Sequence, residues 1–426
     1  MLNTSSLNAV NNAKFSARFI RPLYDSYCFS NIPQTVEFLL TGKGQSGLPL
    51  DVFGDFPIRY DKVILFFIDA FGWCFLERYA DRYEFLKTAL AQGVVSKMTS
   101  QFPSTTAAHV TCVHTGLNVG QSGVYEWHYY EPLVDEVISP LLFSYARDRF
   151  TKDTLKSTGL SAEVFFPRQT FYQRLQTQGV TSHIFQYEGY TPSTYSNAVF
   201  HGATAHAFKT LPLALLQISE LVTAQDSTPT YYFLYFDRID AIGHQYSPNS
   251  KEFEEAVDTF LKSMDSLFYK QLQGQVDNTL FLMTADHGQM EVSPRTTYYL
   301  NKQIPGIERY LKTTDKGRPL VPAGSARDMF LYVKEEYIDE AISSLQEHLI
   351  GKAEVYRTHD LLAQHFFGLQ EPSPTFLNRL GNVVILPYKN ETVWWYEEGT
   401  FAMHFRGHHG GLIPEEMEIP LIVLPL

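Results

Sequence analysis

Three continuous runs of apolar residues end near acidic residues, and this pattern predicts the centre of the fold. The runs and the acidic residues that follow them are Lys62–Ile68 with Asp69, Thr230–Phe236 with Asp237 and Asp240, and Thr279–Thr284 with Asp286. Unbroken apolar runs of this length are typical of strands buried on both faces of a parallel sheet. The acidic residues then lie at the carboxyl edge, where open α/β sheets bind ligands.

Helical periodicity between these runs predicts an α/β core. Apolar residues from Phe253 to Met264 recur at helical spacing, so we expect a helix over Lys251–Tyr269. The last apolar run, Ile419–Leu426, predicts a strand that returns to the core.

The chain divides into three parts by composition. Residues 1–60 are a polar leader that we expect to pack on the core. Residues 61–291 and 401–426 form the predicted core. Residues 292–400 contain several prolines, with predicted strands at Met329–Val333 and Asn382–Pro387 around a helix over Glu335–Leu349. We interpret them as a small α+β insertion.

Composition excludes several classes of protein. The chain has 426 residues, 44% of them hydrophobic, so it is globular rather than disordered. A net charge of −12 argues against a stable nucleic-acid complex, although a local metal ion can still attract a small phosphate ester. Three cysteines and no apolar leader or spanning segment predict a cytoplasmic protein with no membrane association. Nothing in the sequence indicates an oligomeric state.

Pairs of metal-ligating residues stand near the predicted strand ends. Asp286 and His287 follow the third strand directly, and Asp240 and His244 are four residues apart with Gly243 between them. Taken alone, each pair is also compatible with turns or helix caps. In His408-His409-Gly410 two adjacent imidazoles do not readily face one site, so we expect a single ligand there.

A cluster of hydroxyl residues precedes a predicted helix start. Ser104, Thr105 and Thr106 stand just before small residues, where free N–H groups and the helix dipole favour an anion. The segment is compatible with a nucleophile and with an ordinary helix cap. The aromatic run at residues 125–130 likewise has two interpretations, the lining of a substrate pocket or packing under a loop.

The order of these elements along the chain resembles that of the alkaline phosphatase superfamily, and most closely its type I phosphodiesterase and nucleotide pyrophosphatase family. The order is Asp at a strand end, Thr at a helix start, Asp-x-x-x-His, Asp-His and His-Gly. The resemblance covers roughly residues 62–426. It implies a three-layer α/β/α sandwich with a mostly parallel sheet. It also implies a hydrolase of phosphodiester or pyrophosphate bonds with two divalent ions, usually zinc, with manganese or iron as alternatives.

Carried over residue by residue, the resemblance assigns seven positions. One metal would be held by Asp69, Asp286, His287 and the Thr106 oxygen, and the other by Asp240, His244 and His409. Thr106 would be the nucleophile and form a phospho-threonine intermediate with a small phosphate-ester substrate. Within the pair of adjacent histidines, His409 is preferred because it stands directly before Gly410.

Two other functions are compatible with the same residues. The first is a phosphomonoesterase or phosphonate hydrolase, since the superfamily shares its metal core across these substrates. The second is a protein that binds metals without catalysis.

Overall fold

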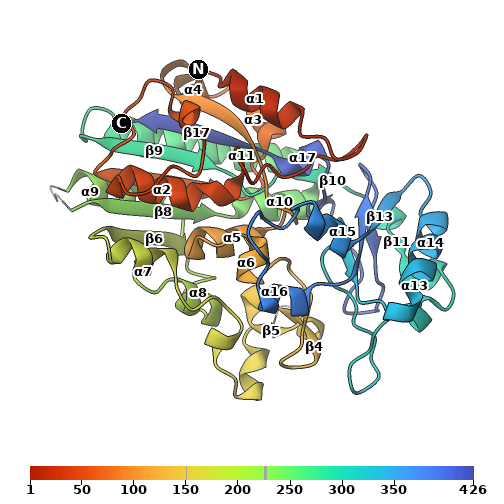
Figure 1. Ribbon diagram of the computed structural model, residues 1–426. Coiled ribbons are helices and arrows are strands. Elements are labelled where there is room, and N and C mark those ends of the chain that lie inside the picture. The colour runs from red at the N-terminus through yellow and green to blue at the C-terminus, as the bar shows by residue number, and fades with distance from the viewer. Residues whose placement is uncertain (150, 225–227) are drawn as a thin grey trace.

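A seven-stranded sheet forms the centre of the structure, a computed structural model that describes residues 1–149, 151–224 and 228–426 (Figure 1). Its strands are β1 (Lys62–Ile68), β2 (Val94–Thr99), β6 (Thr181–Tyr187), β7 (Thr204–Phe208), β8 (Thr230–Phe236), β9 (Thr279–Thr284) and β17 (Glu418–Pro425). They lie in the order β2-β17-β9-β1-β8-β6-β7. Strand β17 runs opposite to the other six strands, which share one direction, so the predicted mostly parallel sheet is confirmed.

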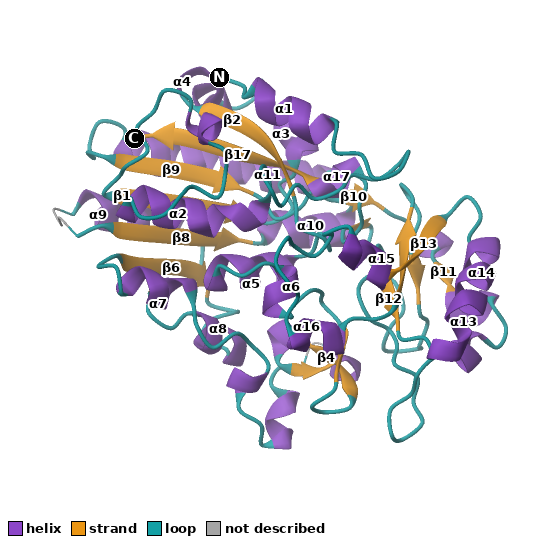
Figure 2. Ribbon diagram, in the orientation of Figure 1, coloured by secondary structure: helices purple, strands orange, loops and turns teal. Residues whose placement is uncertain are grey.

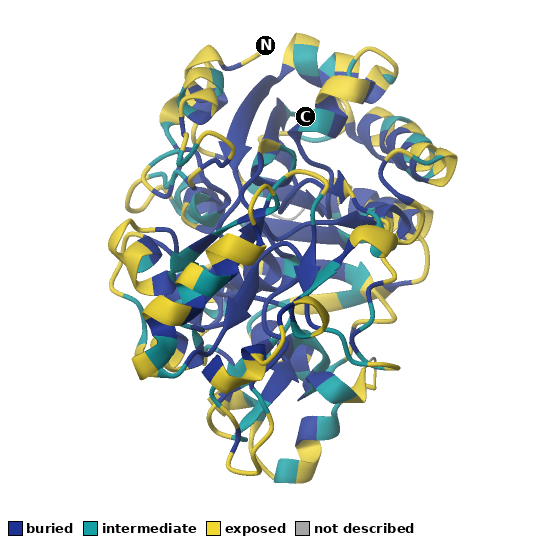
Figure 3. Cartoon of the chain, turned by 90° about the vertical axis from the view of Figure 1, so that its right-hand side faces the viewer, coloured by how far each residue is buried: buried dark blue, intermediate teal, exposed yellow. Residues whose placement is uncertain are grey.

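The register of the three central strands aligns their carboxyl ends. Strand β1 lies between β8 and β9, with Ile68 paired to Phe236 and Phe67 paired to Thr284. The residues that follow these strands therefore emerge at one edge of the sheet. Nearly every residue of the three strands is buried, as their continuous apolar sequence predicts (Figure 3).

Helices cover both faces of this sheet, which confirms the three-layer α/β/α arrangement (Figures 1 and 2). Helices α2, α5 and α7 pack together on one face, and α4, α9, α11 and α12 pack on the other. The helices of the core are α1 (Thr4–Asn11), α2 (Ile32–Thr41), α3 (Trp73–Tyr79), α4 (Glu84–Gln92), α5 (Thr106–Thr115), α6 (Val119–Ser122), α7 (Phe171–Gln176), α8 (Thr194–Val199), α9 (Leu211–Thr223), α10 (Arg238–Tyr246), α11 (Lys251–Ser263), α12 (Lys270–Leu272) and α17 (Pro414–Met417).

The helix predicted over residues 251–269 is not one uniform α-helix. Helix α11 ends at Ser263 and continues as a π-helical segment over Met264–Tyr269. The apolar spacing of so short a segment does not distinguish an α-helix from a π-helix, since Met264 and Phe268 are buried here in the π-helical form.

Residues 1–60 lie against the core. The Asn3 N–H donates to the carbonyl of Val95 at 2.9 Å, which attaches the start of α1 to strand β2. Helix α2 buries Val36, Leu39 and Leu40 in the main hydrophobic cluster.

A second sheet lies within the segment predicted to be an insertion. Strands β12 (Met329–Leu331), β14 (Val383–Pro387) and β13 (Ala353–Arg357) are antiparallel in that order, and α14 (Ile338–His348) packs beside β13. Alternate residues of its strands face different cores. Leu331 and Ile385 join a local cluster, whereas Phe330 and Val384 join the main one. The proposed limits of the insertion, residues 292 and 400, remain a prediction.

Several short elements were not predicted from the sequence. Strands β3 (Tyr129–Glu131), β4 (Glu136–Ser139) and β5 (Ser144–Tyr145) form a small antiparallel sheet. The others are β10 (Met290–Glu291) with β16 (Gly407–His408), β11 (Tyr298–Tyr299) with β15 (Val393–Trp394), and helices α13 (Leu300–Gln303), α15 (Thr358–Ala363) and α16 (Pro374–Arg379). Across the described residues, every helix is too short or too polar to cross a membrane.

A buried ion pair connects the second sheet to the core, and it yields a prediction. Arg327 and Glu416 are fully buried and form two contacts, at 2.7 and 3.0 Å. Arg327→Ala leaves Glu416 without its cation, so we expect a loss of about 3–5 kcal/mol in the free energy of unfolding. Urea unfolding measures this loss, with exposed Arg309→Ala as the control. A loss below about 1 kcal/mol would contradict the prediction.

Candidate metal centre

Asp69, Asp286 and His287 converge at the carboxyl edge of the central strands. All three side chains are buried. Asp286 accepts hydrogen bonds at Oδ1 from the N–H groups of Ala70 and His287, at 3.1 and 2.9 Å. Its other oxygen, Oδ2, and Oδ1 of Asp69 have no hydrogen-bond partner among the described residues. These two free oxygens lie 3.2 and 3.5 Å from Nε2 of His287.

A second group consists of Asp240, His244 and His409. Asp240 and His244 lie one turn apart on α10, which explains their spacing in the sequence. The two oxygens of Asp240 lie 3.3 Å from Nε2 of His244 and 3.7 Å from Nε2 of His409. The two imidazole Nε2 atoms are 3.1 Å apart.

Backbone carbonyls fix the orientation of all three imidazoles. The Nδ1 atoms of His244, His287 and His409 contact the carbonyls of Gly407, Gly288 and Ser104 at 2.7, 3.0 and 3.0 Å. A carbonyl only accepts, so each Nδ1 carries the proton and donates. In the neutral rings each Nε2 then presents a lone pair. Facing lone pairs and carboxylates repel one another unless a cation lies between them, so this donor set fits divalent metal ions.

The hydroxyl of Thr106 faces the same cluster. Thr106 is the first residue of α5, and its Oγ1 lies 3.4 Å from Oδ2 of Asp69 and 3.3 Å from Nε2 of His287. It is partly exposed, whereas Ser104 and Thr105 are buried. The Ser104 hydroxyl donates instead to the carbonyl of Gly411 at 2.8 Å. Thr106 is therefore the hydroxyl of this segment that solvent and a substrate can reach.

The structure brings all seven predicted residues together. Ligating atoms of Asp240, His244 and His409 lie within 4.8 Å of one another, as do those of Asp69, Asp240 and His287. Asp240 belongs to both groups, so the two groups adjoin. The rings of His287 and His409 are stacked with their centroids 3.5 Å apart.

Burial and mutual repulsion perturb the ionisation of these groups. Burial, followed by the charges of Asp286 and Asp240, raises the pKa of Asp69 well above its usual value. Burial also acts to raise the pKa of Asp286, but His287, His109 and the Ala70 N–H together outweigh it and the pKa is lowered. Burial and the neighbouring imidazoles lower the pKa of His409 well below its usual value. A neutral His409 is the form that binds a metal.

His408 lies beside the cluster without entering it. Its ring packs against His244 and Phe405, with centroid separations of 5.5 and 5.7 Å. Its Nδ1 contacts the backbone of His409. This geometry favours His409 over His408 as the residue that faces the other ligands.

Two contributors to the site were not predicted from the sequence. The Tyr235 hydroxyl donates to Oδ2 of Asp69. Gln289 donates from Nε2 to Oδ1 of Asp240 at 2.8 Å. Tyr235 is one of many apolar residues in its strand run, so the sequence carries no separate signal for it. Gln289 follows the Asp-His-Gly motif directly, and this position is the one feature of the sequence that could have indicated its role at the site.

A small cavity of about 180 Å³ opens beside Thr106 and Asp69. Trp127, Lys152 and Tyr190 also line it. For Trp127, this location supports the substrate-pocket interpretation of the aromatic run. Tyr125 and Tyr129 of that run follow a different pattern, since both are fully buried and stack on each other.

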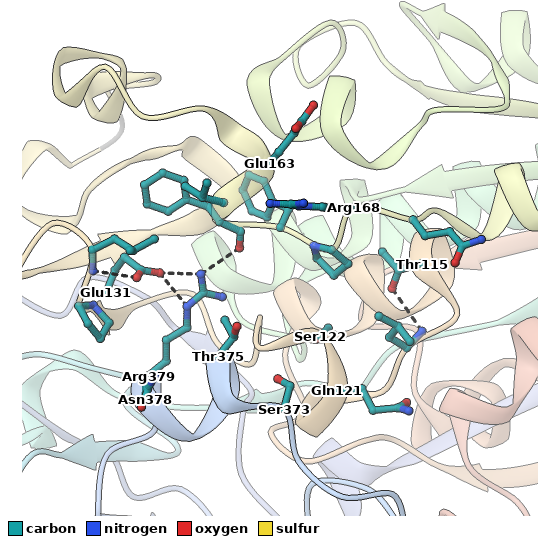
Figure 4. Close-up of a pocket in the computed structure, with 18 of the residues that line it drawn as sticks. Thr115, Gln121, Ser122, Glu131, Glu163, Arg168, Ser373, Thr375, Asn378 and Arg379 are labelled. Carbon is teal, nitrogen blue, oxygen red and sulfur yellow. Dashed lines mark hydrogen bonds and ion pairs between the residues drawn. The ribbon is translucent and has the colours of Figure 1, made fainter.

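A larger cavity of about 640 Å³ lies at the opposite end of α5, where Thr115 and Arg168 are among its lining residues (Figure 4). The Arg379 guanidinium in its wall is bound by Glu131 and by the carbonyl of Phe165. None of the seven predicted residues lines this cavity. Cavity size alone would therefore have pointed away from the metal centre.

The fold and the ligand cluster define an α/β protein with a candidate metal centre at the carboxyl edge of its sheet. Residues 63–412 match the family model of type I phosphodiesterase / nucleotide pyrophosphatase, and the chain belongs to this family. The predicted family resemblance is therefore confirmed.

Two ectonucleotide pyrophosphatases/phosphodiesterases are similar in sequence. Family member 1 of Homo sapiens is 23% identical over an alignment of 258 residues that covers 58% of this chain and 25% of that protein. Family member 3 of Rattus norvegicus is 22% identical over an alignment of 292 residues that covers 66% of this chain and 31% of that protein. The matched regions thus span about a quarter to a third of these relatives.

Solved structures of ectonucleotide pyrophosphatase / phosphodiesterase 5 share the fold. An inactive murine form in complex with AMP has a TM-score of 0.63 and 17% identity, covering 85% of this chain and 87% of that one. The human protein has a TM-score of 0.61 and 15% identity, with coverage of 85% and 87%.

His109 supports the Thr106 segment and generates a pH prediction. Its Nε2 accepts from the Gln101 N–H at 3.0 Å, and its Nδ1 donates to the Thr105 carbonyl at 2.8 Å. Burial lowers its pKa from 6.5 to about 4. The unfolded chain therefore takes up this proton at a higher pH than the folded protein does. Stability from this group is complete above about pH 6.5 and is lost as the pH falls toward about 4, with a total of about 3 kcal/mol.

Unfolding of metal-free protein by urea at several pH values measures this effect. We expect His109→Gln to lose stability less steeply than the wild type between about pH 6.5 and 4. Equal slopes for the two proteins would contradict the assignment.

Proposed function

We propose that this protein hydrolyses phosphodiester or pyrophosphate bonds at a site for two divalent metals, with Thr106 as the nucleophile. One observation carries the proposal. The partly exposed Thr106 hydroxyl lies within 3.4 Å of both Asp69 and His287, inside a cluster of imidazole nitrogens and free carboxylate oxygens.

The proposal assigns the seven residues to two ligand sets, as the family resemblance implies. Asp69, Asp286, His287 and Thr106 would hold one ion, and Asp240, His244 and His409 would hold the other. Mixed nitrogen and oxygen donors suit zinc, with manganese or iron as alternatives. When bound, such ions lower the pKa of a neighbouring hydroxyl and stabilise negative charge on a phosphoryl group.

Residues of the chain attack the substrate, bind its phosphoryl group and orient a metal ligand. The Thr106 oxygen attacks phosphorus, the leaving oxygen departs from the opposite side, and water later hydrolyses the phospho-threonine. Thr106 begins α5, whose first N–H groups have no partner within the helix and favour an anionic phosphoryl oxygen. Tyr235 holds Asp69 by donating to Oδ2, and this leaves Oδ1 free as a ligand.

The small cavity beside Thr106 supports an ester that carries an organic group. Trp127 and Tyr190 offer aromatic surface, and Lys152 offers a positive charge beside it. The murine relative that binds AMP supports a nucleotide-like substrate. A phosphomonoester or phosphonate remains the alternative substrate. A cytoplasmic location stays a prediction, and the relatives carry the names of ectoenzymes.

Substitution of the nucleophile tests the proposal. Thr106→Ala removes the attacking oxygen, so we expect hydrolysis of bis-p-nitrophenyl phosphate by the zinc-loaded protein to fall by about 10³-fold or more. Thr115→Ala, at the other end of α5, is the matched control and should retain activity. Unchanged turnover in Thr106→Ala would contradict the proposed nucleophile. Faster hydrolysis of p-nitrophenyl phosphate than of the diester would favour the monoester alternative.

A second substitution tests the substrate pocket. Trp127→Ala removes aromatic surface beside Thr106, so we expect KM for the aromatic diester to rise about tenfold with little change in kcat, since base-sized stacking is worth about 1–3 kcal/mol. The exposed tyrosine Tyr187, replaced by alanine, is the control. A fall in kcat at unchanged KM would show that Trp127 acts on the reaction rather than on binding.

A further inference from the structure

Two buried carboxyl groups, Glu126 and Asp328, lie on neighbouring segments outside the seven-residue cluster, since the Gly324 N–H donates to the His128 carbonyl at 2.7 Å and the charge of Glu126 acts on Asp328. Glu126 follows α6 and Asp328 precedes β12, and neither has any exposed surface. One oxygen of each, Oε1 of Glu126 and Oδ2 of Asp328, has no hydrogen-bond partner among the described residues. Fully buried carboxylate oxygens without a partner are costly, so each needs an explanation.

The remaining oxygens of the pair are held by backbone and hydroxyl groups. Glu126 accepts at Oε2 from the N–H of Trp127, and the nearby Thr105 hydroxyl acts to lower the pKa of Glu126. Asp328 accepts at Oδ1 from the N–H and the hydroxyl of Ser325, at 3.0 and 2.5 Å. These contacts orient the carboxylates and leave one free oxygen on each.

No basic side chain neutralises the pair within the described part of the chain, where no ion pair of Glu126 or Asp328 is found. The neighbouring Arg327 directs its guanidinium to Glu416 and to the carbonyls of Tyr388 and Glu391. Burial raises the pKa of Glu126 to about 7. Burial and then the charge of Glu126 raise the pKa of Asp328 well above its usual value. Among the described residues, the pair therefore has no Lys or Arg partner.

We propose that Glu126 and Asp328 form a third cation site, specific for a hard divalent ion such as Ca²⁺. The free oxygens of the two carboxylates would be the primary ligands, with the hydroxyls of Thr105 and Ser325 beside them. The site has no imidazole or thiolate, so its chemistry differs from that of the zinc ligands and suits an oxygen-binding ion.

The position of this site gives it a structural role. Thr105 directly precedes the proposed nucleophile. Ser325 contacts the carbonyl of His409 at 3.1 Å, and a Cβ at Gly410 would lie 2.5 Å from the Ser325 hydroxyl. A cation here would join the Thr106 segment, the His409 segment and the second sheet. This inference concerns ion binding and does not depend on the proposed hydrolytic activity.

The test uses the full chain loaded with zinc, with Ca²⁺ alone as the probe. The variants are Glu126→Gln and Asp328→Asn, which keep side-chain size, and Glu163→Gln, an exposed residue, is the control. Bound calcium and zinc are measured by mass spectrometry after desalting, and Tm is measured with and without Ca²⁺. We expect one Ca²⁺ per chain and a rise in Tm of about 5 °C in the wild type and the control. The two variants should show neither effect and should keep the zinc content of the wild type.

Equal calcium binding in all four proteins, or none in the wild type, would overturn the proposal. In the second case the two carboxyls share a proton, and Glu126→Gln should raise Tm in the absence of Ca²⁺.

If the variants do not fold, Tb³⁺ replaces Ca²⁺ in the zinc-loaded wild type. Luminescence excited through tryptophan and lost in Trp127→Phe, with the bound zinc undiminished by Tb³⁺, would support a site beside Glu126. Emission unchanged by Trp127→Phe would overturn it.

Discussion

Repulsion among the acidic groups that meet at one edge of the sheet is the constraint on which the rest of this structure depends. Asp69, Asp240 and Asp286 meet at one edge of the sheet because β1 lies in parallel register between β8 and β9. The backbone holds the three imidazoles so that their Nε2 lone pairs point at the same place. Only positive charge makes this arrangement favourable, and a pair of divalent ions supplies it with the geometry that these donors prefer.

The central strands could be predicted from the sequence, whereas several peripheral strands could not. Strands β1, β8 and β9 are continuous apolar runs, and their observed bounds match the predicted ones. Strand β2 was not predicted because Ser96 and Lys97 interrupt its apolar pattern, although both are buried against α1 and Glu418. Strand β7 lies at the edge of the sheet, where most of its side chains are exposed and no apolar run is required.

The candidate site was likewise only partly accessible from the sequence. Its seven ligand positions follow a recognisable order along the chain, and the fold brings them together. Tyr235 and the Glu126–Asp328 pair had no such signal, because their roles arise from contacts between distant segments. In the buried pair, two side chains 202 positions apart in the sequence influence each other through space. Local sequence patterns do not predict contacts between residues so far apart in the chain.

Anomalous diffraction at the zinc edge from crystals of the zinc-loaded protein tests the central claim most directly. Two peaks are predicted, one contacting Asp69, Asp286, His287 and Thr106, and the other contacting Asp240, His244 and His409. The absence of both peaks, with the imidazoles still arranged as they are here, would contradict the account. A single peak would contradict the two-metal assignment.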